Sequence, residues 1–294
     1  MQENEDIFRK NLRLLSDANA DLSVIRAGIY HEAAYFAKQE SEQKNEPLTP
    51  EDAARLYRGR SAEPLISPDF AEFCREFADS GSFSFIDTYS DEDWFSADTV
   101  RIAYMQNTFS DRAYRIFERV FERVFASYFP SFREVCEEVY YGRSTYGILP
   151  VSSSTDGQLV SFRRLQSKYD LKIALEADVE MNDDTVMRFA LLKKGLATLP
   201  GSLPDLGSSW RYMDVSAVIS EERRVGEFLS AIERLGAVIM NISSAPTYPT
   251  EHYGAAPALT VQLDITGASP DALYLFLEAA HIRYEVFGIY DLLT

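Results

Sequence analysis

Apolar positions spaced three and four residues apart dominate the first part of the chain. They predict a helix from Asp6 to Glu42, with recurring inner positions at Leu12, Leu15, Asn19, Leu22, Ile25 and Ile29. Thr49, followed by Pro50 and Asp52, predicts the N-terminus of a second helix with a capping-box acid. A third helix over 69–79 follows Pro68, and the acidic stretch 87–98 predicts a linker out of this helical segment.

From Thr99 onward, short apolar runs alternate with helical periods. The alternation predicts a small α/β layer with a mainly parallel sheet. The predicted strands are 100–105, 147–151, 171–179 and 185–192, and the predicted helices are 111–128, 131–141 and 160–168.

A stretch rich in Gly and Pro, Lys193 to Ser209, predicts a linker or a long surface loop. After it, strands are predicted at 211–219, 237–243, 258–265 and 284–290, and helices at 221–235 and 270–280. This βαββαβ order is typical of the ferredoxin-like split unit.

Composition and charge narrow the possible partners. The formal net charge of −17 over 294 residues disfavours nucleic acid and anionic membranes, because no basic face offsets it. The two cysteines, Cys74 and Cys136, are expected to be buried thiols in a reducing cytoplasm. No apolar run predicts a signal peptide or a bilayer-spanning segment, which favours a cytoplasmic protein. The three histidines show no metal-ligand spacing, so we expect no metal and no cofactor.

One stretch suggests a ligand site. The apolar run Gly147 to Val151 is followed by the hydroxyl residues Ser152 to Thr155, then Asp156 and Gly157, and then a predicted helix. Such a strand-to-helix turn can present backbone N–H groups and hydroxyls to an anion. On the residues alone, the same stretch is more typical of an ordinary turn in which Ser and Asp cap the helix.

Residues 100–294 resemble the prephenate dehydratase family with its C-terminal ACT domain. Three motifs of the dehydratase part are similar in order: Asn107-Thr108-Phe109-Ser110, then Tyr146-Gly147 with Pro150, Val151, Ser154, Asp156 and Gly157, then Met187-Arg188-Phe189 in the place of the family's Thr-Arg-Phe. The ACT motifs resemble Gly226-Glu227-Phe228, Ile242-Ser243-Ser244-Ala245-Pro246 and Phe287-Gly288-Ile289-Tyr290.

The resemblance implies a mixed α+β and α/β protein of three parts. Residues 1–98 would be a helical segment, either a degenerate chorismate mutase or a packing segment. Residues 99–195 would be a single-lobe α/β layer resembling half of the dehydratase domain, because only 181–184 stands where the second lobe belongs. Residues 209–294 would be a ferredoxin-like ACT domain that forms a homodimer.

The resemblance also implies site residues. Catalytic candidates are Thr185, Arg188 and Thr108, because the family's key threonine position is Met187 here. Substrate-binding candidates are Ser110, Ser152, Ser153, Ser154 and Gly157. Effector-binding candidates are Gly226, Glu227, Phe228, Ile242, Ser243 and Ser244.

Two functions follow from these departures. The first is a regulatory or pseudoenzyme subunit of phenylalanine biosynthesis that binds prephenate or an aromatic amino acid. The second is an active prephenate dehydratase, chorismate mutase or both. A dianionic substrate needs at least two cations near the site, and Arg188 and Arg112 are the candidates on the α/β layer.

Overall fold

The computed structural model divides into two compact units, which we describe separately. The helical unit comprises residues 1–85, 222–236 and 268–282, and the sheet unit comprises 86–221, 237–267 and 283–294. The structure describes residues 18, 22, 24–39, 41–43, 48–59, 64–79, 100–155, 157–180, 185–196, 211–219, 222–245 and 258–293. The predicted linker 87–98 and most of the predicted loop 193–209 lie outside these residues.

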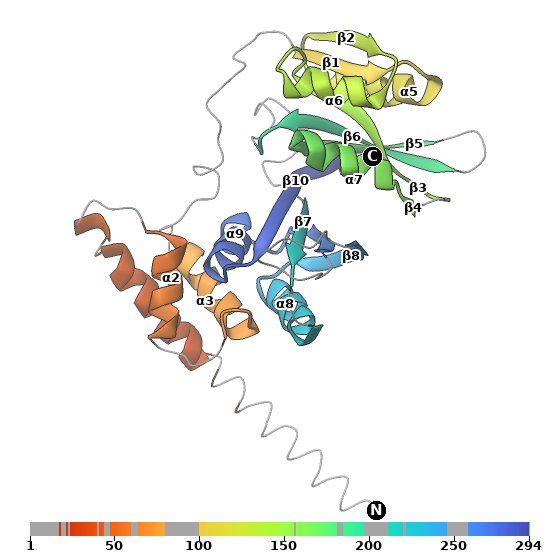
Figure 1. Ribbon diagram of the computed structural model, residues 1–294. Helices are drawn as coiled ribbons and strands as arrows, with labels where there is room; N and C mark the ends of the chain where they lie inside the picture. Colours follow the sequence, from red (N-terminus) through yellow and green to blue (C-terminus); the bar gives the residue numbers. More distant parts are fainter. Residues whose placement is uncertain are drawn as a thin grey trace, which may run out of the picture. The chain divides into compact units, whose positions relative to one another are not determined.

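In the helical unit, residues 24–39 are helical, and four labelled helices accompany them. These are α2 (Pro50–Arg58), α3 (Pro68–Asp79), α8 (Glu222–Arg234) and α9 (Pro270–Ala279) (Figure 1). The predicted cap of α2 is confirmed, since the Thr49 hydroxyl accepts from the Asp52 N–H and the Asp52 carboxylate accepts from the Thr49 N–H. Aromatic side chains form the centre of this unit: Tyr57, Phe70, Phe73, Phe77, Phe228 and Phe276.

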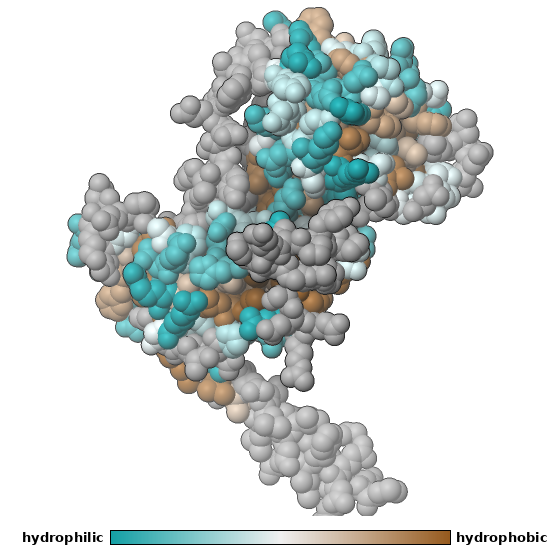
Figure 2. Space-filling view, in the orientation of Figure 1, coloured by the Kyte–Doolittle hydropathy of each residue, from teal (hydrophilic) through white to brown (hydrophobic). Residues whose placement is uncertain are grey.

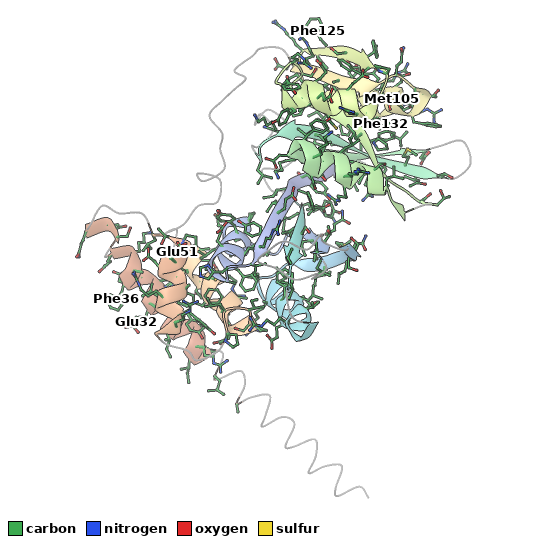
Figure 3. The ribbon with its side chains drawn as sticks, in the orientation of Figure 1. Glu32, Phe36, Glu51, Met105, Phe125 and Phe132 are labelled. Atoms are coloured by element: carbon green, nitrogen blue, oxygen red, sulfur yellow. The ribbon has the colours of Figure 1, made fainter. Side chains whose placement is uncertain are left out.

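The apolar stripe predicted for the first helix is not its buried face. Leu22, Ile25 and Ile29 are exposed, and positions 12, 15 and 19 lie outside the described residues. The buried side chains are instead Tyr30, Ala33, Ala34 and Ala37. Small alanine side chains let this helix lie close to its neighbours. Glu32 and Phe36 point away from the neighbouring helices (Figure 3).

The sheet unit is built around one ten-stranded sheet in the described residues. Its strand order is β2-β1-β3-β6-β5-β10-β7-β9-β8, with β4 paired to β3. The strands are β1 (Val100–Met105), β2 (Val124–Phe129), β3 (Tyr146–Ser153), β4 (Gly157–Gln158), β5 (Leu171–Glu180), β6 (Val186–Lys194), β7 (Tyr212–Val218), β8 (Val238–Ala245), β9 (Ala258–Asp264) and β10 (Arg283–Leu293).

Helices cover both faces of the part of the sheet formed by β1, β3, β5 and β6. On one face α6 (Phe132–Tyr140) and α7 (Val160–Tyr169) pack on a core that includes Val135, Leu149, Phe162 and Ile173. On the other face α5 (Thr108–Phe117) packs on a core that includes Ile102, Phe117, Ile148 and Phe189. On the face of the molecule that Figure 2 shows, hydrophilic and hydrophobic side chains are interspersed over these strands. The predicted mixed α/β character is confirmed.

Two predictions about this layer are wrong in detail. The helix predicted over 111–128 ends at Phe117, continues as a short 3-10 turn (Glu118–Val120) and gives way to strand β2. Val124 and Tyr128, four residues apart, fit a strand's alternation as well as a helix's period, and pairing with β1 decides between them. Phe125, on this edge strand, is exposed (Figure 3). The sheet is also not mainly parallel: β2, β1 and β3 are parallel, whereas β6 is antiparallel to both β3 and β5.

The sheet continues from the strands of residues 100–194 into those of residues 212–293. β10 pairs parallel with β5, with Gly288 opposite Ile173, and antiparallel with β7. A Cβ on Gly288 would lie 2.6 Å from the Cβ and 2.7 Å from the backbone oxygen of Ile173. Only glycine permits this close approach, so Gly288 joins the two parts of the sheet. The division into three domains stays a prediction.

The C-terminal segment has the predicted element order. Along the chain, the elements are β7, α8, β8, β9, α9 and β10. In the sheet, these four strands lie in the order β10, β7, β9, β8. All three pairings, β10 with β7, β7 with β9 and β9 with β8, are antiparallel. β8 therefore lies at one end of the strand order.

Candidate functional site

A cleft of about 230 Å³ opens in the sheet unit where β3, β5 and β6 meet β7, β8 and β9. Apart from Val151 and Gly157, its lining is polar or charged. The polar and charged residues are Ser152, Ser153, Arg163, Glu176, Arg188, Asp214, Asn241, Ser243, Thr260 and Gln262. Strands from both parts of the sheet and one helix, α7, therefore contribute to a single site.

Arg188 on β6 is held by a carboxylate of the neighbouring strand. Asp178 on β5 is its direct cross-strand partner. The guanidinium donates through Nε to Oδ1 of Asp178 at 2.8 Å and through Nη2 to Oδ2 at 2.9 Å. Such bidentate pairing fixes the guanidinium plane. The hydrogen bonds to Asp178 raise the pKa of Arg188, so this side chain is always charged.

A second guanidinium enters the cleft from α7. Arg163 donates to Asp214 on β7, a carboxylate that is 1% exposed, and also to Oε1 of Gln166 at 2.9 Å. The Tyr290 hydroxyl donates to the other oxygen of Asp214 at 2.8 Å and accepts from the Gln262 amide at 2.8 Å. Asp214 thus receives donors from α7 and β10, which are distant in the sequence.

Glu176 is the unusual group of the cleft. Its carboxylate lies on β5, is 1% exposed, and neither oxygen has a hydrogen-bond partner among the described residues. Nη1 of Arg188 lies 3.7 Å from Oε2, which is an ion-pair distance but too long for a hydrogen bond. Burial, and then the charge of Asp214, raise the pKa of Glu176 to about 8. Leaving such a group without a hydrogen bond costs about 1–3 kcal/mol.

The charges of the cleft nearly cancel. The two guanidinium groups are balanced by the carboxylates of Asp178 and Asp214, and Glu176 is largely protonated at neutral pH because of its raised pKa. A dianionic ligand would therefore find both arginines already engaged. This arrangement suits a ligand with little net charge better than a dicarboxylate.

Five of the predicted site residues line this cleft. They are Ser152, Ser153, Gly157, Arg188 and Ser243. Ser154 lies beside it, where its N–H donates to the Val186 carbonyl at 2.8 Å and its hydroxyl accepts from the Val186 N–H at 3.0 Å.

The hydroxyl stretch after β3 forms a hairpin rather than an open strand-to-helix turn. β4 pairs back on β3, Ser152 with Gln158 and Ser153 with Gly157. The N–H groups of Ser154, Thr155 and Leu159 all donate within the protein, to the Val186 carbonyl, the Ser153 hydroxyl and the Val151 carbonyl. These three N–H groups are thus not available to an anion. The alternative, in which Ser and Asp cap the helix, is not confirmed either, because the N-cap of α7 is Leu159 and no side chain caps it.

The remaining predicted catalytic and substrate residues do not line the cleft. Thr108 is the first residue of α5, and Thr185 lies just before β6. Ser110 is buried, and its hydroxyl has no hydrogen-bond partner among the described residues. Met187 packs on the α5 side of the sheet, whereas Arg188 lines the cleft, because successive residues of a strand face opposite sides.

The predicted effector residues lie in two compact units. Gly226, Glu227 and Phe228 lie within helix α8 of the helical unit, where Gly226 and Glu227 are exposed and Phe228 is buried beside Phe276. Ile242, Ser243 and Ser244 are exposed on β8 of the sheet unit.

Four residues of the site were not among the predicted ones: Glu176, Asp178, Arg163 and Asp214. The signal for Glu176 was present, because a glutamate in the apolar run Leu171–Ala177 predicts a buried carboxylate. The other three become recognisable only through pairing between strands or between helix and strand. In the described residues, no group of three His, Cys, Asp or Glu side chains is placed to hold a metal ion, and no helix has the length and apolarity needed to cross a membrane.

Comparisons with known proteins show the fold. No family model and no curated protein matches the sequence. Among solved structures, prephenate dehydratase from Streptococcus mutans is similar with a TM-score of 0.53 and 16% identity over 66% of this chain and 100% of that chain.

Two further structures are less similar. A prephenate dehydratase from Arthrobacter aurescens in complex with L-Phe gives a TM-score of 0.48 at 13% identity, over 65% of this chain and 90% of that chain. A quorum-quenching acylase of a novel type gives 0.47 at 18% identity, over 65% of this chain and 94% of that chain. The likeness to the Streptococcus mutans enzyme confirms the α/β part of the predicted fold: the chain has an α/β fold like that of a prephenate dehydratase.

Proposed function

We propose that this chain is a prephenate dehydratase-like protein associated with phenylalanine biosynthesis, which binds a small carboxylate ligand and does not turn prephenate over. One observation carries the proposal. In the cleft formed by residues that resemble the family's substrate motifs, Asp178 and Asp214 engage both guanidinium groups, Arg188 and Arg163. Dehydration of a dianion needs cations that hold its carboxylates, and these cations are already neutralised.

The position of the family's threonine supports the same proposal. Met187 occupies it, and a thioether can neither donate nor hold a proton. Its side chain packs in the core beneath α5 rather than in the cleft. Thr185, the nearest hydroxyl along the chain, does not line the cleft either. The hydroxyl that the family places at this position is therefore absent from the cleft lining, where the protonated group is Glu176 instead.

The C-terminal segment is proposed to be a ferredoxin-like ACT domain that forms a homodimer. The βαββαβ order and the antiparallel arrangement β10-β7-β9-β8 support this topology. At the end of the strand order, β8 exposes Val238, Met240 and Ile242. An exposed apolar edge strand favours pairing with a second copy. Light scattering would show a dimer that Met240→Glu dissociates and that Lys193→Glu, on β6, leaves intact.

The helical segment is proposed to be a packing segment rather than a chorismate mutase. The Arg26 guanidinium donates to Asp69 at 3.1 Å, and the Tyr30 and Tyr57 hydroxyls donate to the same carboxylate at 2.7 and 2.9 Å. Arg234 is likewise paired with Glu72 at 2.7 Å. A mutase site holds its arginines for a dicarboxylate, whereas these are paired with the partly buried Asp69 and the buried Glu72 of the same unit.

The test separates binding from turnover. Purified protein is incubated with prephenate and, separately, with chorismate, and the products are chromatographed against a buffer blank. We expect neither phenylpyruvate nor new prephenate above the blank, and saturable binding of L-phenylalanine by calorimetry, with the dianion prephenate binding more weakly. Phenylpyruvate that is abolished by Thr185→Ala or Arg188→Ala would overturn the proposal in favour of an active dehydratase. Prephenate formed from chorismate would place a mutase in the helical segment, and absence of any binding would refute the ligand role.

A further inference from the structure

The hydrogen-bonding groups of the cleft are unevenly satisfied. Arg188, Arg163 and Asp214 each have close partners, but both oxygens of Glu176 have none at hydrogen-bond distance among the described residues. Buried carboxylates in folded proteins are nearly always hydrogen-bonded, and exceptions gather at functional sites. The Glu176 side chain also lines the cleft directly. A molecule bound in the cleft would therefore supply the hydrogen bonds that Glu176 lacks.

The charges around Glu176 indicate which chemical group that molecule presents. When Glu176 is ionised, three carboxylates (Glu176, Asp178 and Asp214) face two guanidinium groups (Arg163 and Arg188). One positive charge would balance the set. A primary ammonium supplies that charge and three N–H donors, enough for both Glu176 oxygens. An anionic group at the same place would instead be repelled by Asp214 and Asp178.

The rest of the lining suits the other end of such a ligand. The hydroxyls of Ser152, Ser153, Ser243 and Thr260 and the amide of Asn241 surround the remaining space. Neutral donors of this kind can hold a carboxylate without an additional cation. The volume of about 230 Å³ equals that of seven or eight waters at ~30 Å³ each, which leaves room for a molecule of amino-acid size.

We infer that the cleft binds a free α-amino acid as its zwitterion, with the ammonium group against Glu176 and the carboxylate on the hydroxyl and amide groups of β3, β8 and β9. This inference names the ligand class of the proposed function and rests on it. It places the amino acid between the two parts of the continuous sheet, on the side of β6 that carries Arg188.

Binding should be coupled to release of a proton. Burial keeps Glu176 largely protonated at pH 7, and a docked ammonium would ionise it. The charged and titratable groups that face it come from every neighbouring element: Arg188 on β6, Asp178 on β5, Arg163 on α7, Asp214 on β7 and Tyr290 on β10. Of these, the two arginines stay charged, and burial raises the pKa of Tyr290. The released proton therefore comes from Glu176.

The experiment is isothermal titration of the full chain with L-phenylalanine and with L-glutamine, at pH 7 in phosphate and in Tris. These buffers differ in ionisation enthalpy, so the difference in measured heat gives the protons released. We expect at least one amino acid to bind with release of up to one proton. Glu176→Gln should weaken binding at least tenfold and abolish the release, whereas Glu180→Gln, an exposed glutamate on the same strand, should change neither. 3-Phenylpropionate, which lacks the ammonium, should bind at least tenfold more weakly than L-phenylalanine.

The outcomes separate this inference from the proposed function. An amino acid that binds equally well to Glu176→Gln, or without proton release, would overturn the inference and leave a carboxylate site elsewhere on the chain. Failure of both amino acids to bind would overturn it as well, and prephenate turnover in the separate assay would overturn the proposed function. Ser243→Ala, on an exposed strand position, tests the carboxylate end without changing the core and should weaken binding several-fold.

Discussion

Gly288→Ala tests whether the sheet is continuous. The added Cβ would lie 2.6, 2.7 and 2.9 Å from Cβ, O and N of Ile173, two of which are backbone atoms that cannot rotate away. Relief requires that β10 move away from β5 near Gly288, which weakens the pairing there. Overpacking costs about 1–3 kcal/mol, and each lost hydrogen bond about 1 kcal/mol more. We expect the free energy of unfolding to fall by about 3 kcal/mol.

Urea unfolding followed by far-ultraviolet circular dichroism measures this loss. At a slope of about 2–3 kcal/mol per molar urea, the midpoint should fall by about 1–1.5 M. Gly226→Ala is the matched control, because Gly226 is exposed within helix α8 and its added Cβ would meet nothing within 4 Å. That substitution should stabilise the protein by up to about 1 kcal/mol. A Gly288→Ala midpoint within 0.2 M of the wild type, roughly half a kcal/mol on that slope, would show that β5 and β10 do not pair as described.

Three further predictions concern buried polar groups. Tyr290→Phe removes the hydroxyl between Asp214 and Gln262 and should lower the free energy of unfolding by about 1–3 kcal/mol. Tyr141 is exposed, so Tyr141→Phe should change that free energy by less than about 0.5 kcal/mol. An equal effect of the two substitutions would contradict the hydrogen bonds between Tyr290, Asp214 and Gln262. The folded-state pKa of Glu176 is raised from 4.5 to about 8, so between these pH values the folded state holds a proton that the unfolded state has lost. The free energy of unfolding should therefore fall as the pH rises from about 4.5 to 8, by up to about 1.4 kcal/mol per pH unit. Urea titrations at pH 5 and 8 measure this fall, which Glu176→Gln should reduce. Burial raises the pKa of the Cys74 thiol and raises that of Cys136 to about 12. An aromatic disulfide reagent should therefore label neither thiol in the folded protein at pH 8, and both thiols in urea. Rapid labelling without urea would contradict the burial of these cysteines.

Local sequence patterns predicted most of the helices and strands, because helix caps and strand alternation depend on residues that are close together in the chain. The Thr49 capping box and the strands β5 and β6 all follow from residues a few positions apart. Segment 124–129 shows the limit of such patterns. Its apolar positions satisfy both periods, and the parallel partner β1 makes it a strand. The exposed Ile25 and Ile29 show the same limit, since which face of a helix is buried depends on its neighbours.

The candidate site was only partly predictable for a related reason. Ser152, Ser153, Gly157 and Arg188 were found through short motifs, whose residues are adjacent in the chain. The charge balance that decides the ligand depends on long-range pairs. Arg163 meets Asp214 across 51 positions, and Arg188 meets Asp178 across the β5–β6 hairpin. Sequence spacing carries no signal for such pairs, so the neutralisation of both arginines could be found only in the folded chain.

The contact between Gly288 and Ile173 has a consequence for synthesis on the ribosome. β5 emerges roughly 115 residues before β10, the strand that pairs with its outer edge. At about 5–20 residues per second, that edge waits several seconds with unpaired N–H and carbonyl groups. Such an edge can pair with another nascent chain. Chains that stop short of Arg283 should therefore aggregate, because β10 is the strand that pairs with this edge of β5.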